Sequence, residues 1–239
     1  MKLDILALAA HPDDTELGCA GTLLVHIAQG QKVGVVDFTR GELGTRGSAE
    51  IRNQEANDSA KLMGLAVREN LGFKDGFFVN DESHQRAIIQ KIRRFRPHIL
   101  LVNAPKDRHP DHGRASEVSV TASFLSGLKR IETKDENGLA QEAWRPKAVY
   151  HYVQSDYIHP DFIVDVTEHW DKKMESIMAF KSQFYNPDNQ EEDTYISSKI
   201  FMKGIEARAL DFGRTIGVKY GEGFTVDRTL GVDDLFKFK

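Results

Sequence analysis

The sequence predicts an α/β fold, with a doubly wound, mostly parallel sheet covered by helices on both faces. Apolar runs of strand length alternate with longer helix-like segments through the first half of the chain, which is the pattern of βαβ units. Residues 3–10 and 98–103 are nearly continuous apolar runs, as expected for strands that are buried on both faces. We therefore expect a Rossmann-like arrangement.

Turn residues mark the boundaries of the predicted elements in the first half. Gly30 follows the first helix as a C′ glycine, and Pro97 separates the third helix from its strand. Strands are predicted at residues 3–10, 33–39, 67–73 and 98–103, and helices at 15–29, 49–63, 83–95 and 112–128.

The second half is predicted from weaker patterns. Residues 132–146 are polar and are expected to form an exposed excursion, whereas residues 185–192 form the clearest loop and a conceivable lid. A strand is predicted at 148–154, a further apolar run at 162–166, and helices at 168–184 and 196–212. Because no composition shift divides the chain, residues 1–239 are predicted to be a single domain.

Composition and charge exclude several classes of protein. With 40% hydrophobic and 28% charged residues, the chain is typical of a globular protein rather than a disordered or membrane-spanning one. The net charge of −4 provides no global field for nucleic acid or an anionic membrane. The apolar residues 5–10 lack a basic flank, so no export signal is predicted, and the single Cys19 fits a cytoplasmic location.

The tripeptide His-Pro-Asp occurs three times, at residues 11–13, 109–111 and 159–161. The intervals of 98 and 50 residues match no solenoid repeat. The first copy follows the first predicted strand and the second follows the fourth, so both lie at the carboxyl edge of the sheet, where open α/β sheets bind ligands. The third copy lacks a following helix and is predicted to be a turn, with a substrate contact by His159 as the alternative.

The first two copies and their neighbours supply three histidines and three aspartates, which suit Zn²⁺ with one open position, although Fe²⁺ or Co²⁺ accepts the same donors. His11 and Asp14 are one helical turn apart and can face one point, with His112 arriving from the other loop. Asp13 is then free to take a proton from the attacking water. Either motif alone is also compatible with an Asp N-cap followed by Pro.

Residues 10–14, together with Glu16, Gly18, Gly21 and Thr22, and residues 109–112 resemble the PIG-L/LmbE-like zinc-dependent N-deacetylases. The resemblance implies one Zn²⁺ per chain, bound by His11, Asp14 and His112. It also implies that Asp13 is the general base and that His109 is a charged stabiliser oriented by Asp111.

Residues 2–6, 52–56, 107–108, 182–184 and 220–224 resemble the branch of this family that makes bacillithiol. That branch removes acetate from N-acetylglucosaminyl L-malate. Its members often have Ala-His-Ala-Asp-Asp in the first motif, whereas Pro12 here gives the form common across the superfamily.

The same resemblance implies contacts with the substrate and between subunits. Arg52 and Arg108 would bind substrate, and Tyr195 would lie beside the reacting carbonyl; a surface salt bridge is the alternative for either arginine. The guanidinium fork suits the malate carboxylate because it donates two parallel hydrogen bonds. The family resemblance also implies a homo-oligomer, either a trimer or a hexamer.

Three functions therefore remain open at this point. The first is a metal-dependent deacetylase of N-acetylglucosaminyl L-malate, and the second is the same chemistry on another N-acetyl sugar or on the amide of a sugar-thiol conjugate. The third is a catalytically silent, metal-dependent binding protein, against which the intact Asp13 argues.

Overall fold

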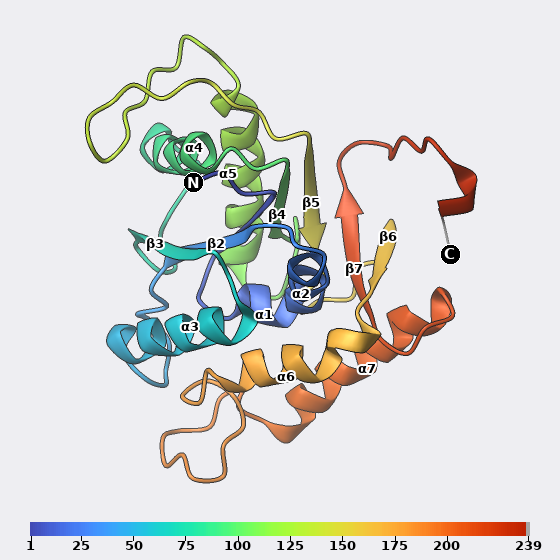
Figure 1. The fold of residues 1–239 in the computed structure, drawn as a ribbon. Coiled ribbons are helices and arrows are strands. Elements are labelled where there is room, and N and C mark those ends of the chain that lie inside the picture. Colours follow the sequence, from blue (N-terminus) through green and yellow to red (C-terminus); the bar gives the residue numbers. More distant parts are fainter. Residues whose placement is uncertain (238–239) are drawn as a thin grey trace.

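The computed structural model describes residues 1–237, in which seven strands form one sheet in the order β3-β2-β1-β4-β5-β7-β6. Neighbouring strands from β3 to β5 are all parallel. β7 runs antiparallel to both β5 and β6. The predicted doubly wound, mostly parallel sheet is confirmed, and Figure 1 shows helices on both of its faces.

Except in the predicted helix at residues 15–29, the observed bounds agree closely with the predicted elements in the first half. The strands are β1 (Ile5–Ala9), β2 (Val33–Thr39), β3 (Val67–Phe73), β4 (Ile99–Asn103), β5 (Ala148–Tyr152), β6 (Phe162–Asp165) and β7 (Gly221–Val226). The α-helices are α1 (Asp14–Gly18), α2 (Ala20–Ala28), α3 (Ala49–Met63), α4 (Glu82–Phe95), α5 (Pro110–Ser126), α6 (Trp170–Met178) and α7 (Lys199–Thr215), and short 3-10 turns lie at Thr167–His169 and Leu235–Lys237.

Alternate side chains of β1 enter the cores on the two faces of the sheet. Leu6 and Leu8 pack in the core that α4 and α5 cover, together with Ile92. Ile5 and Ala7 pack in the core on the side of α2 and α3. Each fully buried Leu or Ile side chain stabilises the fold by about 1.5–3 kcal/mol, so the central strand is fixed from both sides.

The order of the strands creates a switch point beside β1. The chain runs from β1 through β2 to β3 on one side, and then crosses to β4 and β5 on the other side. The loops that follow β1 and β4 therefore emerge next to each other at the carboxyl edge of the sheet. This is the position at which open α/β sheets bind ligands, and these two loops carry the first two His-Pro-Asp copies.

The predicted helix at residues 15–29 is instead two helices, with a break at Cys19. The cause lies in a distant strand. The Glu222 carboxylate on β7 accepts hydrogen bonds from the backbone N–H groups of Gly21 and Thr22, at 2.9 and 2.7 Å. It thereby caps the start of α2 and satisfies N–H groups that a continuous helix would use internally.

The second half differs more from the prediction. The helix predicted at residues 168–184 ends at Met178, and the one predicted at 196–212 runs from Lys199 to Thr215 after the N-cap Ser198. The strand β7 was not predicted, because glycines weaken a strand pattern. Gly223 is required there, since a Cβ atom at this position would lie 2.7 Å from the Phe212 ring.

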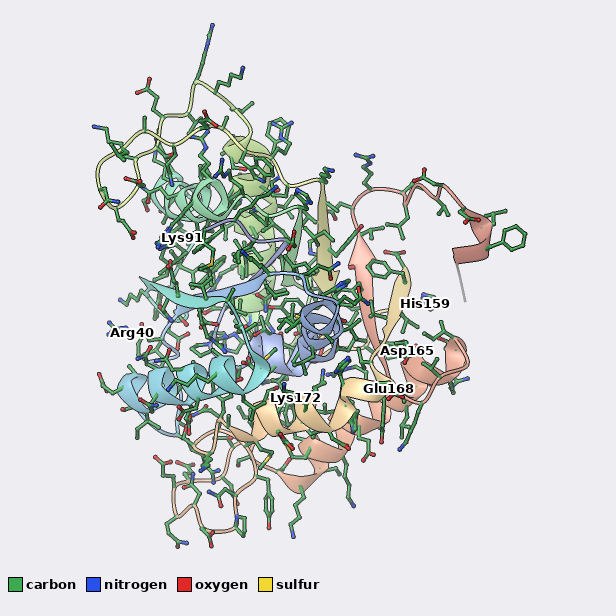
Figure 2. All side chains as sticks on the ribbon, viewed as in Figure 1. Arg40, Lys91, His159, Asp165, Glu168 and Lys172 are labelled. Atoms are coloured by element: carbon green, nitrogen blue, oxygen red, sulfur yellow. The ribbon has the colours of Figure 1, made fainter. Side chains whose placement is uncertain are left out.

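The structure also shows where the predicted excursion and the third His-Pro-Asp copy lie. Residues 132–146 form an irregular excursion with one isolated bridge between Lys134 and Ala140. His159 is exposed in the connection between β5 and β6, and Figure 2 shows it beside β6. Among the described residues, we find no helix with the length and apolar character needed to cross a bilayer.

Candidate metal centre and active-site cavity

The loop after β1 turns sharply at Asp13. Its φ of 115° lies in the left-handed region, which costs a non-glycine residue about 1–3 kcal/mol. Asp13 occupies the N-cap position of α1, yet its carboxylate forms no capping hydrogen bond. It accepts a hydrogen bond of 2.9 Å from the Arg52 guanidinium instead. The N-cap interpretation therefore does not account for this carboxylate.

The loop after β4 presents the second motif at the start of α5. His109 is the N-cap of α5, and its Nδ1 accepts a hydrogen bond of 3.2 Å from the Asp111 N–H. His112 lies in the first turn, with Nδ1 at 2.7 Å from Asp107 Oδ2. A carboxylate on one ring nitrogen fixes the tautomer, so the Nε2 atom of His112 is left to bind a metal.

The two loops meet, as the sequence predicts. Asp14 Oδ1 lies 3.1 Å from His112 Nε2, and Asp14 Oδ2 lies 3.6 Å from His11 Nδ1. The rings of His11 and His112 have centroids 5.6 Å apart. Nitrogen atoms of His11, His109 and His112 also lie within 4.8 Å of one another. Two imidazoles and a carboxylate, with a third imidazole beside them, form a donor set that fits Zn²⁺.

Three hydrogen bonds fix the orientation of the Asp14 carboxylate. It accepts hydrogen bonds from Gln154 Nε2 at 2.6 Å, from Asn103 Nδ2 at 3.1 Å and from the His11 N–H at 2.9 Å. Burial raises its pKa, but the neighbouring His112 and His11 outweigh burial and hold it well below the usual value. These contacts favour the ionised form of Asp14, which is the form that binds a cation.

Sequence reasoning gave no role to Asn103, Gln154, Asp107 or Asp75. Asn103 ends β4 and Gln154 follows β5, so both lie at the same edge of the sheet as the motifs. Their position at the ends of two parallel strands is the sequence feature that could have identified them. Asp107 lies five residues before His112, but nothing in the sequence indicates which way its side chain turns.

Replacing Gln154 with Leu should weaken metal binding by about 10- to 100-fold, because Asp14 loses the donor that fixes its orientation. A chelator-competition titration of the metal-loaded protein measures this affinity. Gln90→Leu, at an exposed position on α4, is the matched control and should leave the affinity unchanged. Equal affinities for the wild type and Gln154→Leu would contradict a role for Gln154 in positioning Asp14.

The other ring nitrogen of His11 faces two carboxylates. His11 Nε2 lies 3.1 Å from Asp75 Oδ1 and 3.4 Å from Asp111 Oδ2. His11, Asp75 and Asp111 thus form a second group of possible metal donors. However, a metal-binding imidazole ordinarily donates its other N–H to a carboxylate, so this arrangement fits His11 as a ligand through Nδ1.

Asp111 contacts His109 through its backbone, whereas its carboxylate has other partners. The Asp111 carboxylate accepts hydrogen bonds from the Gly76 N–H at 2.8 Å and from Arg114 at 2.6 Å, and it faces His11. Only its backbone N–H reaches His109. The stronger donors on the β3–α4 loop and on α5 determine this orientation, so Asp111 supports His11 through its side chain.

Burial dominates the acid-base properties of two further groups in the site. It raises the pKa of Asp13 to about 7, although the Arg52 cation opposes the shift. It lowers the pKa of His109, and the positive charges of His11 and His112 act in the same direction. Both effects act against protonation of the His109 ring.

A cavity of about 350 Å³ lies over these groups. The two arginines predicted to bind substrate occupy different places in it. Arg52 is buried at its base, where it donates to Asp13 and to the carbonyl of Pro12. Arg108 is exposed, with its guanidinium 4.8 Å from the Tyr195 ring centre. Tyr195 itself is 59% exposed, so this pair lines the outer wall of the cavity.

Comparison with known proteins agrees with this geometry. A family model described as PIG-L, GlcNAc-PI de-N-acetylase, matches residues 6–123, which include both motif loops. The chain belongs to the PIG-L family. Its fold matches the crystal structure of the conserved protein TT1542 from Thermus thermophilus, with a TM-score of 0.85, 33% identity, and coverage of 97% of this chain and 98% of that one.

Two relatives within the PIG-L family are deacetylases by name. The diacetylchitobiose deacetylase of Thermococcus kodakarensis is 27% identical over 231 residues, covering 92% of this chain and 81% of that protein. The probable N-acetyl-alpha-D-glucosaminyl L-malate deacetylase 2 of Bacillus anthracis is 25% identical over 193 residues, covering 75% and 81%. Homologues of this chain thus act as deacetylases of N-acetyl sugar conjugates.

Proposed function

We propose that this protein is a metal-dependent N-deacetylase that removes acetate from an N-acetylglucosaminyl conjugate, with N-acetylglucosaminyl L-malate as the first candidate substrate. The main observation in support is that His11, Asp14 and His112 lie together in one cavity. The Asp13 carboxylate beside them makes no helix-capping hydrogen bond. The proposed working unit is a single domain of 239 residues that binds one Zn²⁺.

The ligands proposed for the metal are His11 Nδ1, Asp14 and His112 Nε2, because each has hydrogen bonds that fix it in place. When bound, a divalent metal of this kind polarises an amide carbonyl and makes water a better nucleophile near neutral pH. This choice of ligands leaves His109 and Asp13 for catalysis.

Asp13 is proposed to move the proton in the reaction. Its raised pKa, about 7, is close to the value that serves a general base at neutral pH. Asp13 takes a proton from water as the water oxygen attacks the acetyl carbon. When the carbon–nitrogen bond breaks, Asp13 returns the proton to the amine, so acetate and the free amino sugar leave.

His109 is proposed to stabilise the negative charge that develops on the acetyl oxygen. Its Nδ1 accepts the Asp111 N–H, which places the proton of the neutral ring on Nε2. Such a preorganised donor typically contributes about 2.7–4 kcal/mol to catalysis. A neutral donor requires no protonation, so this role is compatible with the lowered pKa of His109.

Arg52 is proposed to orient Asp13 rather than to bind a substrate carboxylate. Its guanidinium already donates to Asp13, to the Pro12 carbonyl and to the Gly41 carbonyl. Arg108 has its donors at the exposed wall of the cavity and lies against Tyr195. The malyl carboxylates of the candidate substrate are therefore assigned to Arg108.

Replacing Arg108 with Ala should raise KM for N-acetylglucosaminyl L-malate by about tenfold, because a charge-assisted hydrogen bond is lost. KM for N-acetylglucosamine, which lacks the malyl group, should change less than twofold. Steady-state acetate release measures both values. Lys106→Ala, an exposed cation two residues away, is the control. Equal increases in KM for the two substrates would refute carboxylate recognition by Arg108.

The proposed function itself is tested by acetate release from N-acetylglucosaminyl L-malate, N-acetylglucosamine and N,N′-diacetylchitobiose, each with and without a chelator. We expect chelator-sensitive release that is fastest with the malate conjugate. Faster release from diacetylchitobiose would support the proposed deacetylation but would identify a different substrate. No acetate from any of the three would favour a binding protein, and release unaffected by metal removal would refute metal dependence.

A further inference from the structure

The segment between α6 and α7 forms part of the cavity wall, although most of it has no apolar anchor. Thr194, Tyr195 and Ile196 line the cavity. Residues 187–193 precede them and are nearly all exposed. Figure 1 shows this stretch as an irregular loop that leads from α6 into α7. Ile196 packs partly against the core and Tyr195 contacts the Phe201 ring, but residues 187–193 are too exposed to be held by hydrophobic packing.

The start of this segment is anchored to α3. Glu55 accepts hydrogen bonds of 2.7 Å from both the N–H and the hydroxyl of Ser182. Gln183 then donates a 2.8 Å hydrogen bond to the backbone carbonyl of Arg46. Beyond Phe184, the chain leaves the core and becomes exposed.

Arg46 fixes the far part of the segment. This side chain comes from the glycine-rich loop between β2 and α3, and it is only 3% exposed. Its guanidinium donates to the backbone carbonyls of Glu192 and Glu191, at 2.7 and 3.1 Å, and to the Asp193 carboxylate at 2.9 Å. Three donated bonds thus reach three consecutive residues directly before the wall residues.

The carbonyl contacts matter more than the ion pair. The Asp193 side chain is 95% exposed, so solvent screens its charge and the pair stabilises little. The bonds to the carbonyls of Glu191 and Glu192 come from a buried cation, whose donors would be left without partners if the segment moved away. Arg46 therefore selects one backbone path for the segment.

We infer that Arg46 is a specificity-determining positioning residue, which holds residues 191–196 so that Tyr195 and Thr194 wall the cavity. This inference rests on the proposed function, because it assigns the wall to the non-reacting part of the sugar conjugate. Tyr195 contacts Arg108, so a displaced segment would also free the side chain assigned to the malyl group. Arg46 lines the same cavity but is none of the proposed metal ligands, so its role is assigned to binding and not to the chemical step.

The test is Arg46→Met, which keeps an unbranched side chain similar to the aliphatic part of arginine and removes its donors. KM for N-acetylglucosaminyl L-malate should rise about tenfold, with kcat within twofold of wild type and metal content unchanged. Endoproteinase Glu-C should cleave native Arg46→Met after Glu191 and Glu192 at least about tenfold faster, because local opening governs such cleavage. Arg46→Lys, which keeps the charge but offers one donor atom, should shift both values in the same direction by less.

Arg40→Met is the matched control, because Arg40 is an exposed cation of the same loop, visible at the outer edge in Figure 2. It should change neither KM nor the cleavage rate. Faster cleavage with unchanged KM would overturn the role in specificity, and so would a lower kcat with unchanged KM. An unchanged cleavage rate would overturn the inference as a whole. Absence of acetate release by the wild type would refute the proposed function, while the cleavage rates would still decide whether Arg46 holds the segment.

Discussion

Replacing Asp13 with Asn should lower kcat by about 10²- to 10⁴-fold while the protein keeps its metal, because the carboxamide cannot accept the proton from water. Asparagine is the suitable replacement because it tolerates the positive φ that Asp13 adopts, whereas alanine would add backbone strain. Single-turnover acetate release and metal analysis of the same preparation measure the two quantities.

The control for this experiment is Asp58→Asn, which makes the same chemical change on the exposed surface of α3. It should leave kcat within twofold of wild type. Turnover retained by Asp13→Asn would remove Asp13 as the general base. Loss of the metal together with activity would instead identify Asp13 as a ligand and leave the base unassigned.

Replacing Arg68 with Met should destabilise the protein by about 3–5 kcal/mol, because two buried carboxylates lose their shared partner. Arg68 on β3 donates to Asp37 on β2 at 2.8 Å and to Glu16 on α1 at 2.6 Å. All three side chains are almost fully buried. For a chain of this length, the expected fall in Tm is roughly 6–20 °C.

Thermal unfolding followed by circular dichroism measures this effect. Arg86→Met is the control, since Arg86 forms an exposed i,i+4 pair with Glu82 that stabilises by about 0.5 kcal/mol or less. The triple variant Arg68→Met, Glu16→Gln, Asp37→Asn removes the two uncompensated charges and should recover part of the loss. A change in Tm below about 2 °C for Arg68→Met alone would show that this buried cluster contributes little.

The loss of Arg68 should also affect the metal site, because Glu16 lies two residues after Asp14 in the same short helix. α1 has only five residues, so its orientation depends on contacts outside itself. The hydroxyl of Ser59 on α3 also donates to Glu16 at 2.6 Å. The buried cluster of Glu16, Arg68 and Asp37 thus joins the sheet and α3 to the helix that presents the proposed ligand Asp14.

The elements with strong local patterns could be predicted from the sequence. The apolar run that includes β1, and the boundaries marked by Gly30 and Pro97, are properties of neighbouring residues, and the structure has them at the expected places. The break at Cys19 and the strand β7 could not be predicted in this way. The break depends on Glu222, which is about 200 residues away from α2, and β7 depends on pairing with β5 and β6.

The residues of the site likewise divide into those that the sequence could identify and those that it could not. His11, Asp13, Asp14 and His112 were identified because two copies of one motif follow two strands of a parallel sheet, whose carboxyl ends share one edge. The roles of Arg52 and Asp111 were less accessible. Both side chains can reach several hydrogen-bond partners. In the folded protein Arg52 donates to Asp13, and Asp111 accepts from Gly76 and Arg114.

The sequence by itself determined the alternation of strands and helices in the first half of the chain, the two strands buried on both faces, and the meeting of two polar loops at one edge of the sheet. These features follow from the local periodicity of apolar residues and from the short loops that connect consecutive strands and helices. Only the tertiary structure decided that Gln154 and Asn103 hold Asp14, that Arg52 pairs with Asp13, and that Arg46 fixes the segment before Tyr195. Hydrogen bonds between distant segments depend on side-chain directions and burial, which arise only when the whole chain has packed.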